Sequence, residues 1–203
     1  RRILIPFLCL LGLFCTLQAQ DAPGLKIAAL HPILGDMARA IGGSHVQVAD
    51  LLRPNGNLHS FEPAPQDIAA AGQARLVLAS GKNLEPYLPK LKDALGGRAQ
   101  ILDLGASIPD VPVAADTADH DHGHDGDCCA HGPNDPHWWH TPANMKRAAR
   151  ALAAALTRMD PAHEQDYKAG LARWNRKMDQ LSSWARKELA DIPEADRILV
   201  TGH

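Results

Sequence analysis

The chain has 203 residues, a formal net charge of −2, 45% hydrophobic residues and four cysteines. A chain of this length can bury an ordinary core. A charge near zero without a basic stripe gives no support to nucleic-acid binding, so no nucleic-acid partner is expected.

The first residues are typical of a secretory signal. Arg1 and Arg2 precede an apolar run that ends at Leu17, and the small residue Ala19 follows. This pattern predicts a signal peptide over residues 1–19 and a periplasmic protein. The run is short for a membrane span, although an uncleaved anchor is the alternative. The bulky Phe14 before Cys15 disfavours lipid attachment at that cysteine.

Residues 24–159 alternate predicted strands with predicted helices. The strands are Leu25–Leu30, Val46–Leu52, Leu76–Ala79 and Ile101–Leu104, and the helices between them are Ile33–Ile41, Pro65–Gln73 and Pro86–Leu95. Strands and helices in this rhythm favour an α/β fold with a parallel sheet covered on both faces. The Pro-, Gly-, Asp- and His-rich residues 107–134 are predicted to form a long loop.

Two helices are predicted after this loop. Thr141 is the expected N-cap of a helix from Pro142 to Met159. Residues 160–192 form the second, longer element. Its apolar stripe, at spacings of three and four, consists of Tyr167, Leu171, Trp174, Met178, Leu181 and Ala185. A coiled coil is the alternative, but the stripe is short and Gly170 weakens it, so we expect a strut packed across a globular body.

A new strand is predicted at residues 197–201, after Pro193 ends the long helix. Residues 196–203 are therefore interpreted as the start of a second α/β lobe that is mostly absent from this sequence. The mature chain would keep only the adjacent Cys128 and Cys129, which cannot build a disulfide framework.

Six of the eleven histidines lie between His120 and His140. Imidazole is the commonest protein ligand of divalent transition metals, and a His-rich tract of this composition can hold metal but cannot build a core. The tract suggests accessory metal ligands that raise the ion concentration near a main site, although a solvated insertion without a role explains it equally well. The accessory candidates are His120, His122, His124 and His131.

Three other histidines follow strand ends or precede a helix. His59 follows a strand-end turn, His137 lies just before a helix, and His203 follows the last predicted strand. Ligands of α/β sheets gather beyond the carboxyl ends of strands. The three imidazoles could therefore meet at one ion.

These histidines lie in segments that resemble one family, the periplasmic or surface solute-binding proteins of zinc and manganese ABC importers. The similar segments, in the same order, are Leu51–Asp67, Gly81–Leu88, Asp135–Pro142 and Val200–His203. The resemblance implies two α/β lobes joined by one long helix, and an ion in the cleft between them. It implies His59, His137 and His203 as metal ligands, with a fourth, carboxylate ligand beyond this sequence.

The sequence departs from the family in one place, because Asn57-Leu58 stands where many members have Asp-Pro before the first ligand. Three imidazoles and one carboxylate suit tetrahedral Zn(II), whereas Mn(II) prefers more oxygen ligands. We therefore expect a zinc-binding protein that is a monomer, is not an enzyme and delivers its ion to an ABC permease. A manganese or mixed-metal protein is the alternative.

Several neighbouring residues are expected beside the site. Glu62 and Trp139 are expected to contact the ion's ligands, and Trp138 is expected to wall the site or simply to pack. His31, His45 and His163 are expected on the surface. Two functions of other classes remain as rivals: a zinc hydrolase, which would need an open metal position and a general base, and a metal buffer or chaperone in which the His-rich loop is the whole function.

Overall fold

The computed structural model describes residues 24–112, 134–193 and 196–197 of the chain. Its four strands are β1 (Leu25–Ala29), β2 (Val46–Asp50), β3 (Leu76–Ala79) and β4 (Gln100–Asp103). They form one parallel sheet in the order β2-β1-β3-β4. The predicted α/β class with a parallel sheet is confirmed, and each strand begins or ends within two residues of its predicted bounds.

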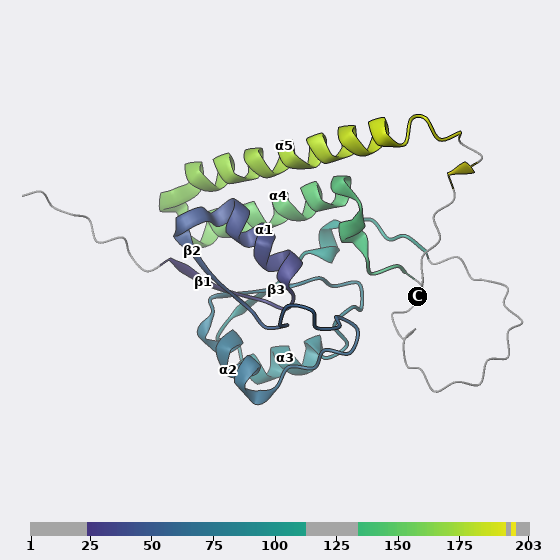
Figure 1. Cartoon of the computed structure of the whole chain (residues 1–203). Helices are drawn as coiled ribbons and strands as arrows, with labels where there is room; N and C mark the ends of the chain where they lie inside the picture. Colours follow the sequence, from purple (N-terminus) through teal and green to yellow (C-terminus); the bar gives the residue numbers. More distant parts are fainter. Residues whose placement is uncertain (1–23, 113–133, 194–195, 198–203) are drawn as a thin grey trace, which may run out of the picture.

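Helices cover both faces of the sheet (Figure 1). The helices α1 (Pro32–Gly42), α4 (Pro142–Met159) and α5 (Glu164–Glu188) lie on one face, and α2 (Pro65–Gln73) and α3 (Leu88–Leu95) lie on the other. Short 3₁₀ turns occur at η1 (Gly43–His45), η2 (Gly105–Ser107), η3 (Trp138–His140) and η4 (Pro161–His163).

The strands supply two cores because successive side chains point to opposite faces. In β3, Leu76 and Leu78 join the core under α1 and α4, whereas Val77 and Ala79 join the core under α2 and α3. All four side chains are fully buried. A strand buried on both faces needs a continuous apolar run, and this is why Leu76–Ala79 has no polar residue.

The long helix α5 packs on α1 and α4 through the first half of its apolar stripe. Tyr167 is fully buried, and Leu171, Trp174 and Met178 pack against the same core. Farther along, Leu181 and Trp184 are 45% and 60% exposed. The stripe therefore packs along the globular body for about half its length, as a strut does. No helix among the described residues is long and apolar enough to cross a membrane.

The bounds of α3 and the cap of α4 differ from the sequence predictions, and the long element predicted at 160–192 is an α-helix over Glu164–Glu188. The helix predicted from Pro86 begins at Leu88, because residues 86 and 87 form a turn. Thr141 occupies the N-cap position of α4, but its side chain makes no capping hydrogen bond within the part of the chain that the structure describes. The predicted signal peptide, most of the predicted loop 107–134, and all but the first residue of the predicted strand 197–201 lie outside the described residues.

Candidate metal centre

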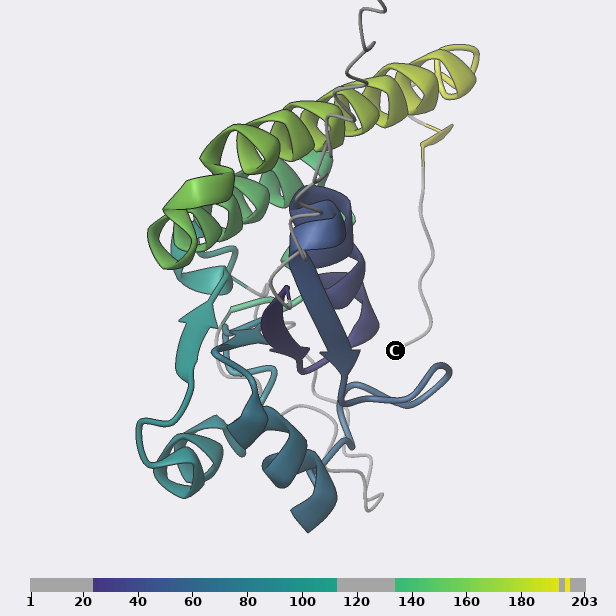
Figure 2. The ribbon, with the colours of Figure 1, turned by 90° about the vertical axis from the view of Figure 1, so that its left-hand side faces the viewer.

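The two loops that carry His59 and His137 share one local design. His59 lies in the loop after β2, which projects beyond the end of that strand (Figure 2). Its backbone N–H donates to Oδ1 of Asn57 at 2.9 Å, and the backbone N–H of His137 donates to Oδ1 of Asp135 at 2.8 Å. An Asx side chain that accepts from the second residue after it makes a tight turn. Asn57 therefore supplies the turn that Asp supplies in the other loop.

The structure brings the two imidazoles together. Nε2 of His137 lies 3.1 Å from Nε2 of His59, although the residues are 78 positions apart. The ring planes are inclined at 60°. Two nitrogens bound at about 2.05 Å to a tetrahedral zinc ion are about 3.3 Å apart. The pair therefore has the spacing and the atoms of two ligands of one metal ion.

Asp135 holds the ring of His137 from behind, a role that the sequence reasoning missed. Its Oδ1 lies 2.7 Å from Nδ1 of His137. Burial opposes ionisation, but the backbone and ring hydrogen bonds from His137 hold the pKa of Asp135 below its usual value. An ionised carboxylate on Nδ1 keeps the proton there, so that Nε2 is the ring nitrogen whose lone pair can bind a metal. The signal in the sequence was an Asp two residues before the predicted ligand.

The two tryptophans after His137 have different surroundings. Trp139 is half-buried, and its ring packs edge-on against that of His137, with centroids 5.3 Å apart. Trp138 is 5% exposed and donates from Nε1 to the Ser80 carbonyl oxygen at 3.0 Å. Trp139 thus lies where a wall of the site is expected, and Trp138 is part of the core. His140 is exposed.

The expectation that His31 lies on the surface is wrong. His31 is 1% exposed, and its ring packs against Trp139 with centroids 5.5 Å apart. It is buried because it lies just beyond the end of the central strand β1 and is covered by Trp139, from the loop that carries His137. Neither ring nitrogen has a hydrogen-bond partner among the described residues. Burial lowers the pKa of His31 to about 4, so the ring is neutral.

His45 and His163 are half-buried rather than fully exposed, and they lie away from the ligand loops. Their rings stack with centroids 3.8 Å apart. Nε2 of His45 is hydrogen-bonded to Oδ2 of Asp166 at 3.0 Å, and Nδ1 of His163 is hydrogen-bonded to Oδ2 of Asp160 at 2.6 Å. This cluster joins the start of α5 to the turn before β2.

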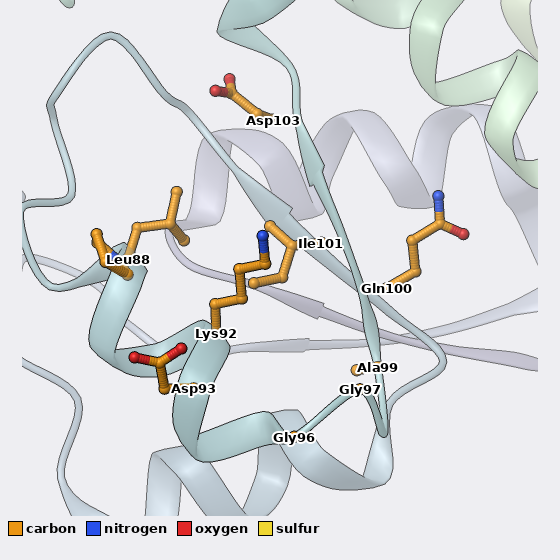
Figure 3. Close-up of a pocket in the computed structure, with 10 residues that line it drawn as sticks. Leu88, Lys92, Asp93, Gly96, Gly97, Ala99, Gln100, Ile101 and Asp103 are labelled. Carbon is orange, nitrogen blue, oxygen red and sulfur yellow. The ribbon is translucent and has the colours of Figure 1, made fainter.

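Glu62 is exposed and lines a hollow between α2 and α3, together with Tyr87 and Lys90. A wider hollow of about 820 Å³ lies between α3 and β4, with Leu88, Lys92 and Ile101 among its lining residues (Figure 3). It contains no histidine. The sequence pattern around His59 and His137, and not the size of a cavity, therefore locates the candidate centre.

The third predicted ligand, His203, lies outside the described residues, as do the accessory candidates His120, His122, His124 and His131. Among the described residues, no group of three or more His, Cys, Asp or Glu side chains could hold a metal ion. The described part thus provides two candidate nitrogen ligands, His59 and His137, whose element, spacing and support from Asp135 fit a divalent metal.

The chain is similar to known metal-binding proteins and to a zinc-uptake family. A family profile described as ZnuA, zinc-uptake complex component A periplasmic, matches residues 27–203. The chain is 30% identical over 187 residues to the iron-binding protein YfeA of Yersinia pestis, covering 90% of this chain and 55% of that protein. It is 27% identical over 180 residues to the manganese-binding lipoprotein MntA of Bacillus subtilis (strain 168), covering 88% and 55%.

Solved structures have the same fold. A crystal structure of ZnuA matches with a TM-score of 0.71 and 27% identity, covering 84% of this chain and 61% of that one. A Mn-bound periplasmic metal binding protein from candidatus liberibacter asiaticus matches with a TM-score of 0.63 and 20% identity, covering 82% and 55%. The chain thus spans a little over half the length of these relatives.

Proposed function

Because the chain belongs to the ZnuA family of periplasmic zinc-uptake components, we propose that it captures Zn(II) and delivers it to the permease of an ABC importer. One observation carries the proposal: the Nε2 atoms of His59 and His137 lie 3.1 Å apart, and Asp135 supports the second ring. The family consists of substrate-binding components, so we propose a transported ion and not a catalytic metal.

The ligand set favours zinc. Neutral imidazole nitrogen suits Zn(II), whereas Mn(II) favours a higher share of oxygen ligands. With His203 as a third imidazole and one carboxylate, the proposed shell is tetrahedral. Relatives named for iron and manganese support the alternative of a manganese or mixed-metal protein.

The proposed mechanism uses ligands from two lobes. His59 and His137 bind the ion from the lobe described here, and His203 with a carboxylate binds it from the second lobe. Ligands on both sides bind the closed arrangement better than the open one, so the ion shifts the protein toward closure. The permease then recognises the closed form, and separation of the lobes releases the ion.

Metal titration of the intact protein tests this function. We expect one tight zinc ion per molecule, displaced weakly by Mn(II) and Fe(II) in competition with a chelator. His59→Ala and His137→Ala should each weaken zinc binding at least about 100-fold. His45→Gln is the matched control, because it removes an imidazole away from the ligand loops. Preference for Mn(II) at equal concentrations would favour the alternative metal.

Two further assays address the rival functions. Deletion of residues 116–132 should leave the tight one-to-one zinc site and remove only weaker binding. Loss of all tight binding would show that the protein is a buffer whose function lies in the loop. The zinc-loaded protein should also have no esterase or lactamase activity, and turnover would favour a hydrolase.

A further inference from the structure

The loop between β3 and α3 connects the candidate metal centre to a buried carboxylate, Glu85. We propose that Glu85 is a positioning residue for the centre: it fixes the Ser80 carbonyl that holds Trp138, and through Trp138 it sets the place of His137. This inference rests on the proposed function, since it assigns a role in the same site. It also gives a function to the Gly81–Leu88 segment, which the zinc ligands do not explain.

The backbone of this loop needs to be held by other groups. Gly81, Lys82 and Asn83 have φ angles of 73°, 55° and 61°, three successive residues in the left-handed region. Only glycine adopts this region without a steric cost. At Gly81 a Cβ would also overlap the Asp103 carboxylate. Interactions with other side chains must therefore favour this conformation over the ordinary ones.

Glu85 provides those interactions on one side. Its two carboxylate oxygens accept hydrogen bonds from the backbone N–H of Ser80, at 2.7 Å, and of Gly81, at 2.9 Å. Glu85 is 6% exposed, so these two hydrogen bonds form away from water. Burial raises the pKa of Glu85 to about 7, although the two N–H donors favour the ionised form. A side chain with only one acceptor would leave a buried N–H unpaired.

Trp138 lies on the other side of Ser80. The Ser80 carbonyl oxygen accepts the 3.0 Å hydrogen bond from the indole Nε1, in a buried environment. Trp138 directly follows His137 and opens the short 3₁₀ turn η3. The backbone N–H of Ser80 thus faces Glu85, its carbonyl faces Trp138, and the residue just before Trp138 is the proposed zinc ligand His137.

Metal binding depends on this arrangement, because a metal site tolerates only small displacements of its ligands. His59 and His137 are on loops from different elements, so their separation depends on how η3 lies on the end of β3. Ligands must be held to within about half an ångström of their productive positions. If the Ser80 peptide turned away, Trp138 would lose its partner and His137 would no longer keep its spacing from His59.

Glu85→Gln tests the inference in the intact protein at pH 8, where the wild-type side chain is ionised. Glutamine keeps the size of the side chain and one acceptor oxygen. Its amide N–H₂ would face a backbone N–H, and two donors cannot form a hydrogen bond. We expect zinc affinity to fall about 10- to 100-fold, the range for residues that orient metal ligands. Glu188→Gln, at an exposed position on α5, is the matched control and should bind zinc as the wild type does.

A double-mutant cycle separates positioning from general damage to the fold. Trp138→Phe keeps an aromatic ring but removes the Nε1–H donor. If Glu85 acts through Trp138, adding Glu85→Gln to Trp138→Phe should weaken zinc binding no further. Independent losses that multiply would overturn the inference.

A measurement without metal makes the outcome independent of the proposed function. In ¹⁵N-labelled, zinc-free protein, the indole resonance that disappears in Trp138→Phe belongs to Trp138. Glu85→Gln should shift this resonance and speed its exchange with solvent, whereas Glu188→Gln should not. An unchanged resonance would refute the role of Glu85 and leave the zinc function standing. If the protein bound no zinc, the proposed function would be refuted. The indole resonance would still show whether Glu85 positions Trp138.

Discussion

Two imidazoles from distant parts of the chain meet because each is held by an oxygen two residues before it. Asn57 and Asp135 make the same turn, but only Asp135 brings a negative charge to the ring of its histidine. A carboxylate partner orients the imidazole and makes Nε2 a better donor to a metal. The loops of His59 and His137 therefore have similar geometry and different electrostatics.

The charge of Asp135 can be removed without removing its turn. Asp135→Asn keeps an Oδ1 acceptor for the backbone N–H of His137, but it loses the negative charge beside Nδ1. We expect zinc affinity to fall about 10- to 100-fold with little change in thermal stability of the metal-free protein. Chelator competition measures the affinity. Asp36→Asn, at an exposed residue on α1, is the control, and an equal loss in both variants would contradict the assignment.

The buried His31 predicts a specific dependence of stability on pH. Its pKa is about 4 in the folded chain and about 6.5 when unfolded, so the unfolded state binds more protons between these values. Stability should therefore fall as the pH drops from 6.5 to 4, by about 3 kcal/mol for this group.

His31→Phe should remove that loss while keeping the packing against Trp139. The variant should also be more stable at pH 7, because two buried nitrogens without partners disappear. Urea unfolding at pH 7, 5.5 and 4 measures both effects. Parallel curves for the wild type and the variant would contradict the account.

At the scale of elements, hydrophobic spacing predicted most of the structure. The sequence pattern placed α2, β3 and α4 at their observed bounds, because Pro at the first helical position and short apolar runs are strong local signals. The start of α5 lies later than predicted, because Pro161–His163 forms a 3₁₀ turn. Whether the end of a helix is α or 3₁₀ depends on small energy differences, which the sequence pattern does not resolve.

Gly170 shows what local patterns could not predict. In the sequence it appears as a weak point in a helical stripe, but in the structure α5 lies closely against α1 there. A Cβ at Gly170 would overlap the Ile41 carbonyl oxygen, which is part of the backbone and cannot turn aside. The glycine therefore permits the close packing of the two helices.

Gly170→Ala should destabilise the protein by about 2–3 kcal/mol, through overpacking against the backbone of α1. The same substitution in α2, Gly72→Ala, is the matched control. There the new methyl group meets only the Arg98 side chain at an ordinary 3.5 Å. It should stabilise the protein by about 0.5 kcal/mol, because alanine restricts the unfolded chain. Thermal unfolding of both variants measures these changes in stability. Equal losses of stability in the two variants would contradict close packing at Gly170.

At the scale of the whole molecule, the parallel sheet explains why the candidate site is where it is. His31 follows β1, the His59 loop follows β2, and Ser80 follows β3, so the carboxyl ends of three strands meet at one edge. The chain reverses its direction of strand addition between β1 and β3, and ligand sites in α/β sheets form at such points. The alternation of elements predicted this edge. Of the three histidines that were expected to meet there, the structure brings His59 and His137 together, and His203 lies outside the described residues.

The strand order and the contacts between loops did not follow from the alternation alone. The roles of His31, Asp135 and Glu85 depend on which loops cover which strand ends. These contacts join residues far apart in sequence, so periodicity and turn signals carry no information about them. The His137 loop lies on the end of β3 through the hydrogen bond of Trp138 to Ser80, which joins residues 58 positions apart in the sequence.

Anomalous diffraction from crystals of the zinc-loaded, intact protein tests the central claim most directly. The account predicts one fully occupied zinc ion at about 2.0–2.1 Å from Nε2 of both His59 and His137. A fully loaded crystal in which zinc binds only elsewhere, with His59 and His137 sharing no ion, would contradict it.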